Sequence, residues 1–304
     1  MRKTVVALGM FDGVHFGHRV LLARTAELAR ALDAEAVALT FSTHPRALFS
    51  GSFAVLSASP LKERLIAETG VAVDTVPFTA DFAALSPEAF VQWLCDRYAN
   101  RIAAVVCGYD YRFGKGAAGS GETLQRLGAE YGFATEILPP VYYRDEPCSS
   151  TRVRRALMEG DIVSVNTMLT RPYAITGKVV HNRAIGRTLG FPTANVDSGA
   201  QLLPKDGVYA GALLLDGRLY AAVTNVGCNP TVDGTERTLE THVLDASLEL
   251  YGKTVTVLFL QMLREERRFP SKQALTDQIR IDAAAAKKVF QVSEKSVYNR
   301  VKVW

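Results

Sequence analysis

The sequence has no run of about 18 consecutive apolar residues, the length that a membrane-spanning helix needs, so we expect no such segment. Its four cysteines are scattered without CxxC or metal-ligand spacing, which argues against a disulfide framework and favours reduced thiols in a cytoplasmic protein. The net charge is only +4, and we expect neither a nucleic-acid nor a membrane partner. No GxxxxGK[ST] segment is present, which excludes a P-loop nucleotide site.

What is present is a composition typical of a folded chain: 48% hydrophobic and 22% charged residues, in 304 residues that allow about two domains. In the first half, apolar runs alternate with segments of helical periodicity. Strands are predicted at 4–8, 36–41, 71–76, 102–107 and 134–138, and helices at 18–32, 61–69, 89–98 and 122–131. This alternation predicts an α/β domain, a Rossmann-like parallel sheet with helices on both faces, in which ligands bind at the carboxyl ends of the strands.

After about residue 160 the pattern changes to short alternating runs separated by Gly, Pro, Asp and Asn. Strands are predicted at 173–180, 207–215, 218–223, 239–244 and 254–259, which favours a small antiparallel β-barrel, with a sandwich as the alternative. A terminal helix is predicted at 271–290. Residues 291–304 are only weakly patterned.

The segment after the first predicted strand has the features of a phosphate-binding turn. It runs from Gly9 to His18 and ends in His15-x-Gly17-His18. Free backbone N–H groups and the helix dipole at such a turn favour a bound phosphate, and glycine lets a nucleotide approach the backbone. Two imidazoles can donate hydrogen bonds to charge that develops in a phosphoryl-transfer transition state. The alternative is that both histidines are ordinary surface residues.

Two further segments follow predicted strands of the same sheet. Residues 149–154 read Ser-Ser-Thr-Arg-Val-Arg at a predicted helix start, where hydroxyls can bind phosphate and Arg154 can pair with a departing pyrophosphate. Plain helix capping is the alternative. Residues 108–116 form a glycine-rich turn that contains Asp110 and Phe113 and suits a stacked ring, with a mobile basic loop as the alternative.

The most informative part of the second half runs from Gly177 to Asn195. A strand leads into a loop with glycines and arginines and then into Phe-Pro-Thr-Ala-Asn. If 193–195 are extended, Thr193 and Asn195 point to the same face, and their oxygens suit Mg²⁺ that carries phosphates. The alternative is a Gly/Pro-rich connection with polar caps.

Glu240 lies on the predicted strand 239–244 and shares a face with His242. A carboxylate held beside a hydroxyl can accept its proton as the oxygen attacks phosphorus. For an isolated glutamate, a solvated strand face is the alternative.

Together, the motifs resemble two known domains. Five segments of the second half are similar to the riboflavin kinase domain and occur in the same order. They are Gly-Phe-Pro-Thr-Ala-Asn at 190–195, Leu-Pro-Lys-Asp-Gly-Val-Tyr at 203–209, Asn-Val-Gly-Cys-Asn-Pro-Thr at 225–231, Glu-Thr-His-Val-Leu-Asp at 240–245, and Leu-Arg-Glu at 263–265 followed by Phe269. The HxGH segment, Thr-Phe-Ser-Thr-His-Pro at 40–45 and residues 149–154 resemble the FMN adenylyltransferase half of the prokaryotic bifunctional riboflavin kinase/FAD synthetases, which belongs to the nucleotidylyltransferase superfamily. The resemblance covers about residues 3–290.

The resemblance implies an FMN adenylyltransferase domain over 1–158, a linker over 159–170, a riboflavin kinase domain over 171–290 and a tail over 291–304. The kinase domain would phosphorylate riboflavin to FMN with ATP and Mg²⁺. The other domain would join FMN to the AMP part of ATP, giving FAD and pyrophosphate. The implied partners are these small molecules, and a homo-oligomer is left open.

The resemblance also implies roles for individual residues. The catalytic residues would be His15, His18 and Glu240. The adenylyltransferase would bind ATP through Gly9, Phe11, Gly17, Asp110, Ser150, Thr151 and Arg154; the kinase would bind ATP through Gly177, Gly186, Arg187, Gly190, Pro192, Thr193 and Asn195; the flavin would contact His44, Pro45, Phe113 and Arg264; and Mg²⁺ would be held by Thr193 and Asn195.

Three positions depart from the pattern of the family. Thr43 stands where the family usually has a proline. Asn182 and Thr170, the residue before Arg171, each stand where the family commonly has a glycine. None of these changes removes an implied catalytic group, so we expect both activities. The alternatives are a riboflavin kinase with an impaired adenylyltransferase half and a non-catalytic flavin- or nucleotide-binding module.

Overall fold

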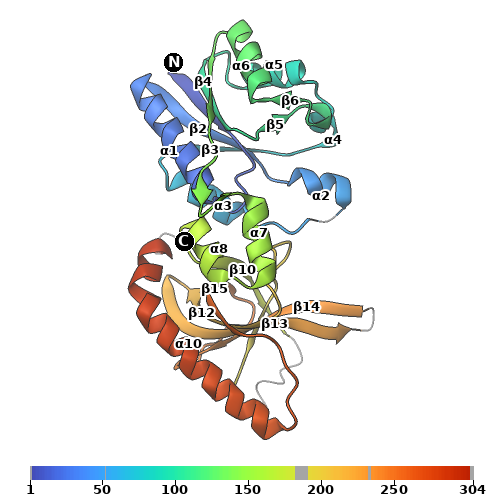
Figure 1. The fold of residues 1–304 in the computed structure, drawn as a ribbon, viewed down its shortest axis with the longest axis vertical. Helices are drawn as coiled ribbons and strands as arrows, with labels where there is room; N and C mark the ends of the chain where they lie inside the picture. Colours follow the sequence, from blue (N-terminus) through green and yellow to red (C-terminus); the bar gives the residue numbers. More distant parts are fainter. Residues whose placement is uncertain (1, 52, 182–190, 232–233, 302–304) are drawn as a thin grey trace. The chain divides into compact units, whose positions relative to one another are not determined.

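The computed structural model describes residues 2–51, 53–181, 191–231 and 234–301 (Figure 1). The chain folds into two compact units. Unit 1 comprises Met1–Val55 and Ser59–Ser149, and unit 2 comprises Leu56–Ala58 and Ser150–Trp304. In the part of the chain that is described, no helix is long and apolar enough to cross a bilayer.

Unit 1 is built on a five-stranded parallel sheet in the order β3-β2-β1-β4-β7. These strands are β1 (Lys3–Leu8), β2 (Ala34–Phe41), β3 (Ala72–Val76), β4 (Ile102–Gly108) and β7 (Ala134–Leu138). Val5, Val6 and Ala7 of the central strand are fully buried, as expected for a parallel strand covered on both faces. The predicted parallel sheet is confirmed.

The connections of unit 1 are mostly helical. They are α1 (Phe16–Ala31), α2 (Pro45–Ser50), α3 (Ser59–Ala67), α4 (Ala80–Ala83), α5 (Pro87–Arg97), the 3₁₀ turn η1 (Lys115–Ala117) and α6 (Gly121–Tyr131), with small hairpins of β5 (Arg112–Phe113) and β6 (Gly119–Ser120) and of β8 (Tyr142–Tyr143) and β9 (Glu146–Pro147). Local chemistry sets the start of α5, because Pro87 occupies its first turn and the hydroxyl of Ser86 accepts from the N–H of Ala89 at 3.1 Å. Phe90 and Leu94 of α5 then pack into the core beneath the sheet.

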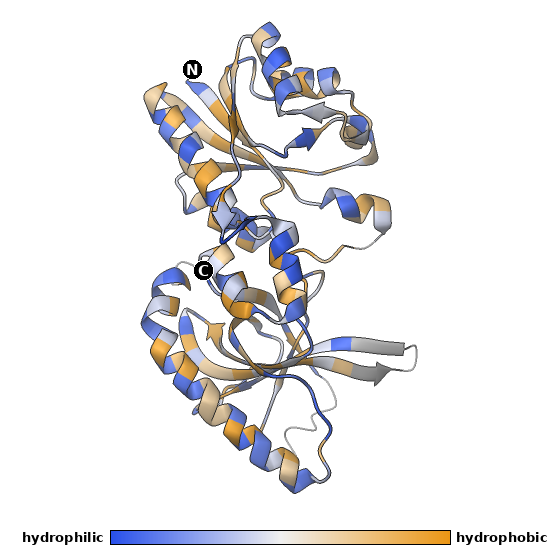
Figure 2. Ribbon diagram, in the orientation of Figure 1, coloured by the Kyte–Doolittle hydropathy of each residue, from blue (hydrophilic) through white to orange (hydrophobic). Residues whose placement is uncertain are grey.

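Unit 2 is a closed barrel in the order β10-β11-β14-β13-β12-β15. Its strands are β10 (Tyr173–Val180), β11 (Ala194–Val196), β12 (Gly207–Leu215), β13 (Arg218–Thr231), β14 (Gly234–Val243) and β15 (Thr254–Arg264), preceded by α7 (Ser150–Glu159) and α8 (Ile162–Leu169) and followed by α10 (Lys272–Val301). The predicted antiparallel barrel with a terminal helix is confirmed. Hydrophobic and hydrophilic residues alternate along α10, which lies against β12, β13 and β15 (Figure 2).

The barrel strands extend beyond their predicted ends. β13 and β14 pair from Ala222 opposite Val243 to Thr231 opposite Gly234, through glycine, asparagine and proline residues that disfavour strands. Cross-strand pairing therefore overrides local propensity here. A helix, α8, also occupies most of the segment 159–170 that the sequence pattern left as a linker.

α8 ends at a residue that departs from the pattern of the family. Thr170 has φ +58° and ψ +18°, the left-handed conformation in which glycine usually ends a helix. The Arg300 side chain of α10 donates a hydrogen bond to the Thr170 carbonyl. Thr170 thus adopts a backbone conformation that carries a steric cost for threonine and none for glycine.

The terminal helix continues to Val301, whereas the sequence pattern predicts its end at 290. Val297 is 3% exposed and Val292 is 90% exposed, so the added turns carry a buried side and a solvated side. We expect Val297→Ala to lower the free energy of unfolding of unit 2 by about 1–3 kcal/mol, because it removes two buried methyl groups and leaves a cavity. Denaturant unfolding measures this change.

The matched control is Val292→Ala, which changes the same residue type on the same helix and should stay within about 0.5 kcal/mol of the wild type. Equal effects of the two substitutions would contradict the packing role of the helix end.

Candidate active sites

The turn between β1 and α1 brings the two predicted catalytic histidines together. His15 is the N-cap of α1, with extended backbone, and His18 lies in the first turn of that helix. Their rings stack with centroids 3.7 Å apart. A Cβ on Gly17 would lie 3.2 Å from the His15 ring, so the glycine leaves room for the ring at the positive end of the helix dipole.

Phe11 and Gly9 form the wall behind these rings. The Phe11 ring is fully buried and meets His18 edge-on at 5.2 Å between centroids. A Cβ on Gly9 would lie 3.0 Å from the same phenyl ring, so a larger residue there would displace it. On the neighbouring strand, β4 ends at Gly108 and the exposed Asp110 follows, which places Asp110 at the same edge of the sheet as Gly9.

Burial fixes the charge state of the histidine pair. His15 is 6% exposed, and its Nδ1 atom and that of His18 are buried without a hydrogen-bond partner among the described residues. Burial lowers the pKa of His15 to about 4. Burial also lowers the pKa of His18, with the charges of His15 and Lys62 adding to the effect. Both rings are therefore neutral near pH 7, and each carries one N–H donor.

In unit 2, three strands place a row of polar side chains on one face. Asn195 of β11 lies opposite Glu240 of β14, and Glu240 lies opposite Asn225 of β13. Residues directly opposite each other across strands project from the same face. The row therefore contains an amide, a carboxylate and a second amide, and the Asn225 amide donates to a Glu266 carboxylate oxygen at 3.2 Å.

The segment before β11 is tied to the strand that carries Glu240. The His242 Nδ1 atom lies 2.8 Å from the Pro192 carbonyl oxygen, and the rings of Phe191 and His242 meet edge-on at 5.6 Å. Thr193 follows Pro192 directly, one residue before β11 begins. These contacts hold the Phe-Pro-Thr-Ala-Asn segment against β14.

The oxygen atoms of this site suit magnesium. Thr193 and Asn195 supply a hydroxyl and an amide oxygen, hard donors of the kind that Mg²⁺ prefers when it also keeps waters and substrate phosphates. Across the described residues, no group of three or more His, Cys, Asp and Glu side chains could hold a metal ion by itself. The chemistry of the donors therefore fits Mg²⁺ bound together with a nucleotide.

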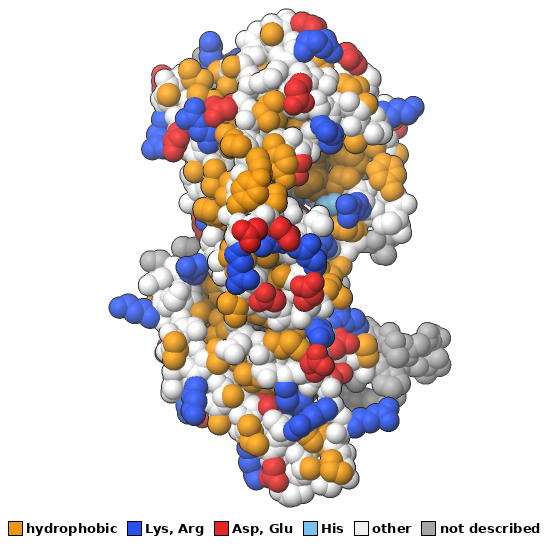
Figure 3. All heavy atoms as spheres, in the orientation of Figure 1, with side chains coloured by type: hydrophobic (Ala, Val, Ile, Leu, Met, Phe, Trp, Pro, Cys, Tyr) orange, Lys and Arg blue, Asp and Glu red, His pale blue; other side chains and the backbone are white. Residues whose placement is uncertain are grey.

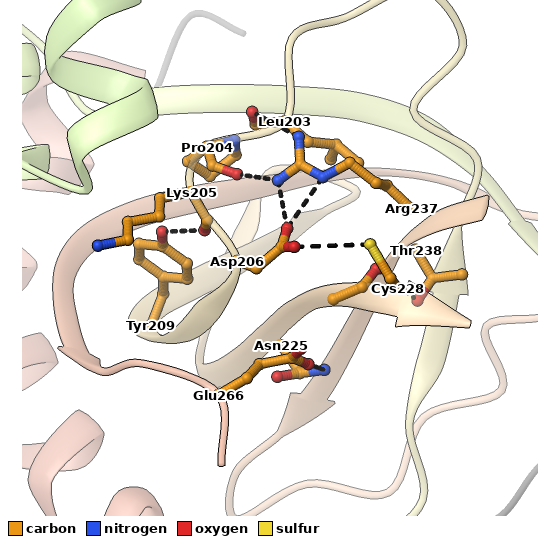
Figure 4. Close-up of polar contacts among 11 residues, drawn as sticks. Leu203, Pro204, Lys205, Asp206, Tyr209, Asn225, Cys228, Arg237, Thr238 and Glu266 are labelled. Atoms are coloured by element: carbon orange, nitrogen blue, oxygen red, sulfur yellow. Dashed lines mark hydrogen bonds and ion pairs between the residues drawn. The ribbon is translucent and has the colours of Figure 1, made fainter. Parts of the chain in front are cut away.

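A further network fixes the loop that precedes β12 (Figure 4). The Arg237 guanidinium donates to the Asp206 carboxylate at 2.9 Å, to the Leu203 carbonyl at 3.3 Å and to the Pro204 carbonyl. The Cys228 thiol lies 3.5 Å from the other Asp206 oxygen. The Arg237 guanidinium thus ties two backbone carbonyls and the carboxylate of the Leu-Pro-Lys-Asp segment to β14.

Comparison with known proteins assigns each half of the chain to a family. Residues 1–152 match the family model described as FAD synthetase, and residues 169–290 match riboflavin kinase. The bifunctional riboflavin kinase/FMN adenylyltransferase of Escherichia coli K12 is 37% identical over 294 residues, covering 95% of this chain and 94% of that protein. The protein of the same name from Pseudomonas fluorescens is 37% identical over 291 residues, covering 94% and 93%.

The chain belongs to the bifunctional riboflavin kinase/FMN adenylyltransferase family. The resemblance inferred from the motifs is therefore confirmed, and so is the assignment of one activity to each half. A Streptococcus pneumoniae structure described as a macrolide-efflux protein shares the fold, with a TM-score of 0.85 and 31% identity over 94% of each chain.

The structure places other predicted residues of this family as follows. His44 caps α2, its Nδ1 accepting from the Arg46 N–H at 3.1 Å, and its ring stacks on Phe53 at 4.1 Å. Pro45 starts α2, so the turn forms although Thr43 replaces the usual proline. Gly177 lies on β10, where a Cβ would collide with the Asp197 carbonyl oxygen. Ser150, Thr151 and Arg154 lie in the first turns of α7, in unit 2.

Two predicted flavin residues have well-defined protein contacts of their own. Phe113 is buried in the core of unit 1 and packs on Phe90 at 4.9 Å. Arg264 donates three hydrogen bonds to the buried Asp282 of α10, at 3.2, 3.0 and 2.9 Å. Their role in flavin binding stays a prediction. Gly186, Arg187 and Gly190, and with them Asn182, lie outside the described residues.

Two residues at these sites were not singled out from the sequence. Lys62 of α3 is buried beside the end of β2, and Arg237 of β14 holds the loop described above. Neither falls in a recognisable motif, because each acts through long-range contacts. Across the face shown in Figure 3, positive and negative side chains are interspersed on each unit.

The depressed pKa of His15 predicts a dependence of stability on pH. Its ordinary value is 6.5 and its folded value is about 4, so in this window the unfolded chain binds a proton that the folded unit does not. The stability of unit 1 should fall as the pH drops from about 6.5 to about 4, by roughly 3 kcal/mol from this residue. Urea unfolding in a Trp304→Phe background follows unit 1 through Trp93, the remaining tryptophan.

The comparison protein is His15→Asn in the same background, which lacks this titration and should lose less stability over the same range. Identical pH profiles for the two proteins would show that His15 is not held neutral by the fold.

Proposed function

We propose that unit 2 phosphorylates riboflavin to FMN through Glu240, and that unit 1 adenylylates FMN to FAD through His15 and His18. One observation supports the proposal: each of the two units contains one cluster of polar groups suited to its reaction. Unit 1 has a stacked pair of neutral imidazoles at a helix N-terminus, and unit 2 has a carboxylate flanked by two amides on three paired strands. The proposed domain limits are 1–158, 159–170, 171–290 and 291–304. The proposal includes a cytoplasmic location and riboflavin, FMN and ATP as partners, with no nucleic-acid or membrane partner; a homo-oligomer is left open.

In the kinase reaction, Glu240 accepts the proton of the riboflavin 5′-hydroxyl as that oxygen attacks the γ-phosphorus of ATP. The bond from that phosphorus to the β,γ-bridging oxygen breaks, and ADP leaves with the electron pair. Thr193 and Asn195 would hold the phosphates together with Mg²⁺, which when bound supplies charge neutralisation on the phosphate oxygens. The fixed register between β11 and β14 supports this role, because it keeps Asn195 beside the base.

In the adenylyl transfer, His15 and His18 donate hydrogen bonds to the α-phosphate as a phosphate oxygen of FMN attacks it and pyrophosphate departs. Neutral rings suit this task, since a donor placed in a dry site stabilises developing charge without a proton transfer. Gly9, Gly17 and Asp110 would border the nucleotide. Ser150, Thr151 and Arg154, at the start of α7, are proposed as phosphate ligands.

The kinase assignment predicts that Glu240→Gln loses FMN formation and keeps FAD formation. Removing the base should lower the rate of riboflavin phosphorylation by about 10²–10⁴-fold. Chromatography of the products from riboflavin with Mg·ATP measures the first step, and the same assay started from FMN measures the second. Normal riboflavin phosphorylation by this variant would rule out Glu240 as the base.

The adenylyltransferase assignment predicts the converse for the double variant His15→Ala, His18→Ala. FMN should accumulate without FAD, because each lost donor costs about 10²–10³-fold in the rate of transfer. The same chromatography detects it, with riboflavin phosphorylation as the internal control. The wild-type chain distinguishes the alternatives: FMN without FAD would indicate a kinase with an impaired second half, and flavin binding without ATP consumption a binding module.

A further inference from the structure

Unit 1 contains a buried cation that the mechanism above leaves unused. Lys62 of α3 is 4% exposed, although lysine is almost never so deeply buried without a charged partner. Its Nζ atom donates to the Phe41 carbonyl at 2.6 Å and to the Thr40 hydroxyl at 3.3 Å, and it forms no ion pair with a carboxylate of the described chain. An ammonium has three N–H donors, so one is left for another acceptor.

The position of Lys62 connects it to the histidine turn. Thr40 and Phe41 are the last residues of β2, which pairs with β1. The Thr40 hydroxyl in turn donates to the Met10 carbonyl at 3.0 Å, in the segment that leads from β1 to His15. The ammonium charge contributes to the lowered pKa of His18, which places it within electrostatic range of the imidazole pair.

Two opposing effects act on the charge of Lys62. Burial lowers its pKa, and the carboxylates of Asp12 and Glu63 act in the opposite direction. Asp12 is itself only 4% exposed and lies in the same turn as the histidines. Keeping an ammonium in such a place without a directly paired carboxylate is costly, and a preorganised charge of this kind is useful where a reaction creates negative charge.

Adenylyl transfer creates that need. A phosphate oxygen of FMN forms a bond to the α-phosphorus of ATP, the bond from that phosphorus to the bridging oxygen breaks, and pyrophosphate leaves with the electron pair. Two anions must approach each other, and neutral imidazoles supply hydrogen bonds but no net positive charge. We infer that Lys62 contacts a phosphate oxygen at the reacting α-phosphate with its third N–H and is a catalytic residue of the FAD-forming site, an assignment that rests on the proposed function of unit 1.

The test is Lys62→Met, which keeps the length of the side chain and removes its charge. The kcat for FAD formation from FMN and Mg·ATP should fall by about 10²-fold or more, the effect of losing one preorganised transition-state donor. Riboflavin phosphorylation by unit 2 should be unchanged, and thermal unfolding checks that unit 1 of the variant is folded. The matched control is Arg64→Met, which removes a positive charge from the exposed side of the same helix and should form FAD at the wild-type rate.

A second variant separates chemistry from support of β2. Lys62→Gln retains a donor for the Phe41 carbonyl without the charge. If Lys62→Met unfolds unit 1, the inference is supported when Lys62→Gln folds and its kcat for FAD formation is still reduced about 10²-fold. The inference is overturned when either variant forms FAD with a kcat within about threefold of the wild type. It is also overturned when neither variant folds, because the lysine then has a structural role. Failure of the wild-type chain itself to form FAD would instead defeat the proposed function.

Discussion

Parallel strands all end at one edge of their sheet, and this constraint decides where unit 1 can perform chemistry. The loops after β1, β2 and β4 must meet there, whatever their sequences. The histidine turn follows β1, the carbonyl that receives Lys62 ends β2, and Asp110 follows β4. Burial at this edge also lowers the pKa values of His15 and Lys62, which keeps the imidazole neutral and makes the ammonium costly.

In unit 2 a different constraint brings the polar side chains together. An antiparallel barrel has no common edge at which strands end, and its functional groups are aligned by the register between neighbouring strands instead. Asn195, Glu240 and Asn225 form a row only because β11, β14 and β13 pair at those residues. A slip of one residue would turn Glu240 to the opposite face, so the hydrogen bonds of the barrel backbone keep the proposed base in the row.

Much of this could be predicted from the sequence, and the reasons differ between features. The parallel sheet, the barrel and the histidine turn rest on local patterns, namely apolar runs, alternation and short motifs, and these were confirmed. The last turns of α10 were missed because the burial of Val297 and Val301 is set by the tertiary structure and is not marked by the weak pattern of that segment. Lys62 was missed for a related reason: 44 residues separate it from His18 (62 minus 18), and nothing local marks a lysine as buried.

The occurrence of both family domains in one polypeptide has a consequence for the supply of cofactors. Each copy of the polypeptide carries one site for riboflavin phosphorylation and one site for FMN adenylylation. A change in gene expression therefore changes the number of both sites equally. The relative capacity of this polypeptide for the two steps is then set by the turnover and saturation of the separate sites. Selection for a different balance would act on individual side chains in one half while leaving the dosage of the other half unchanged.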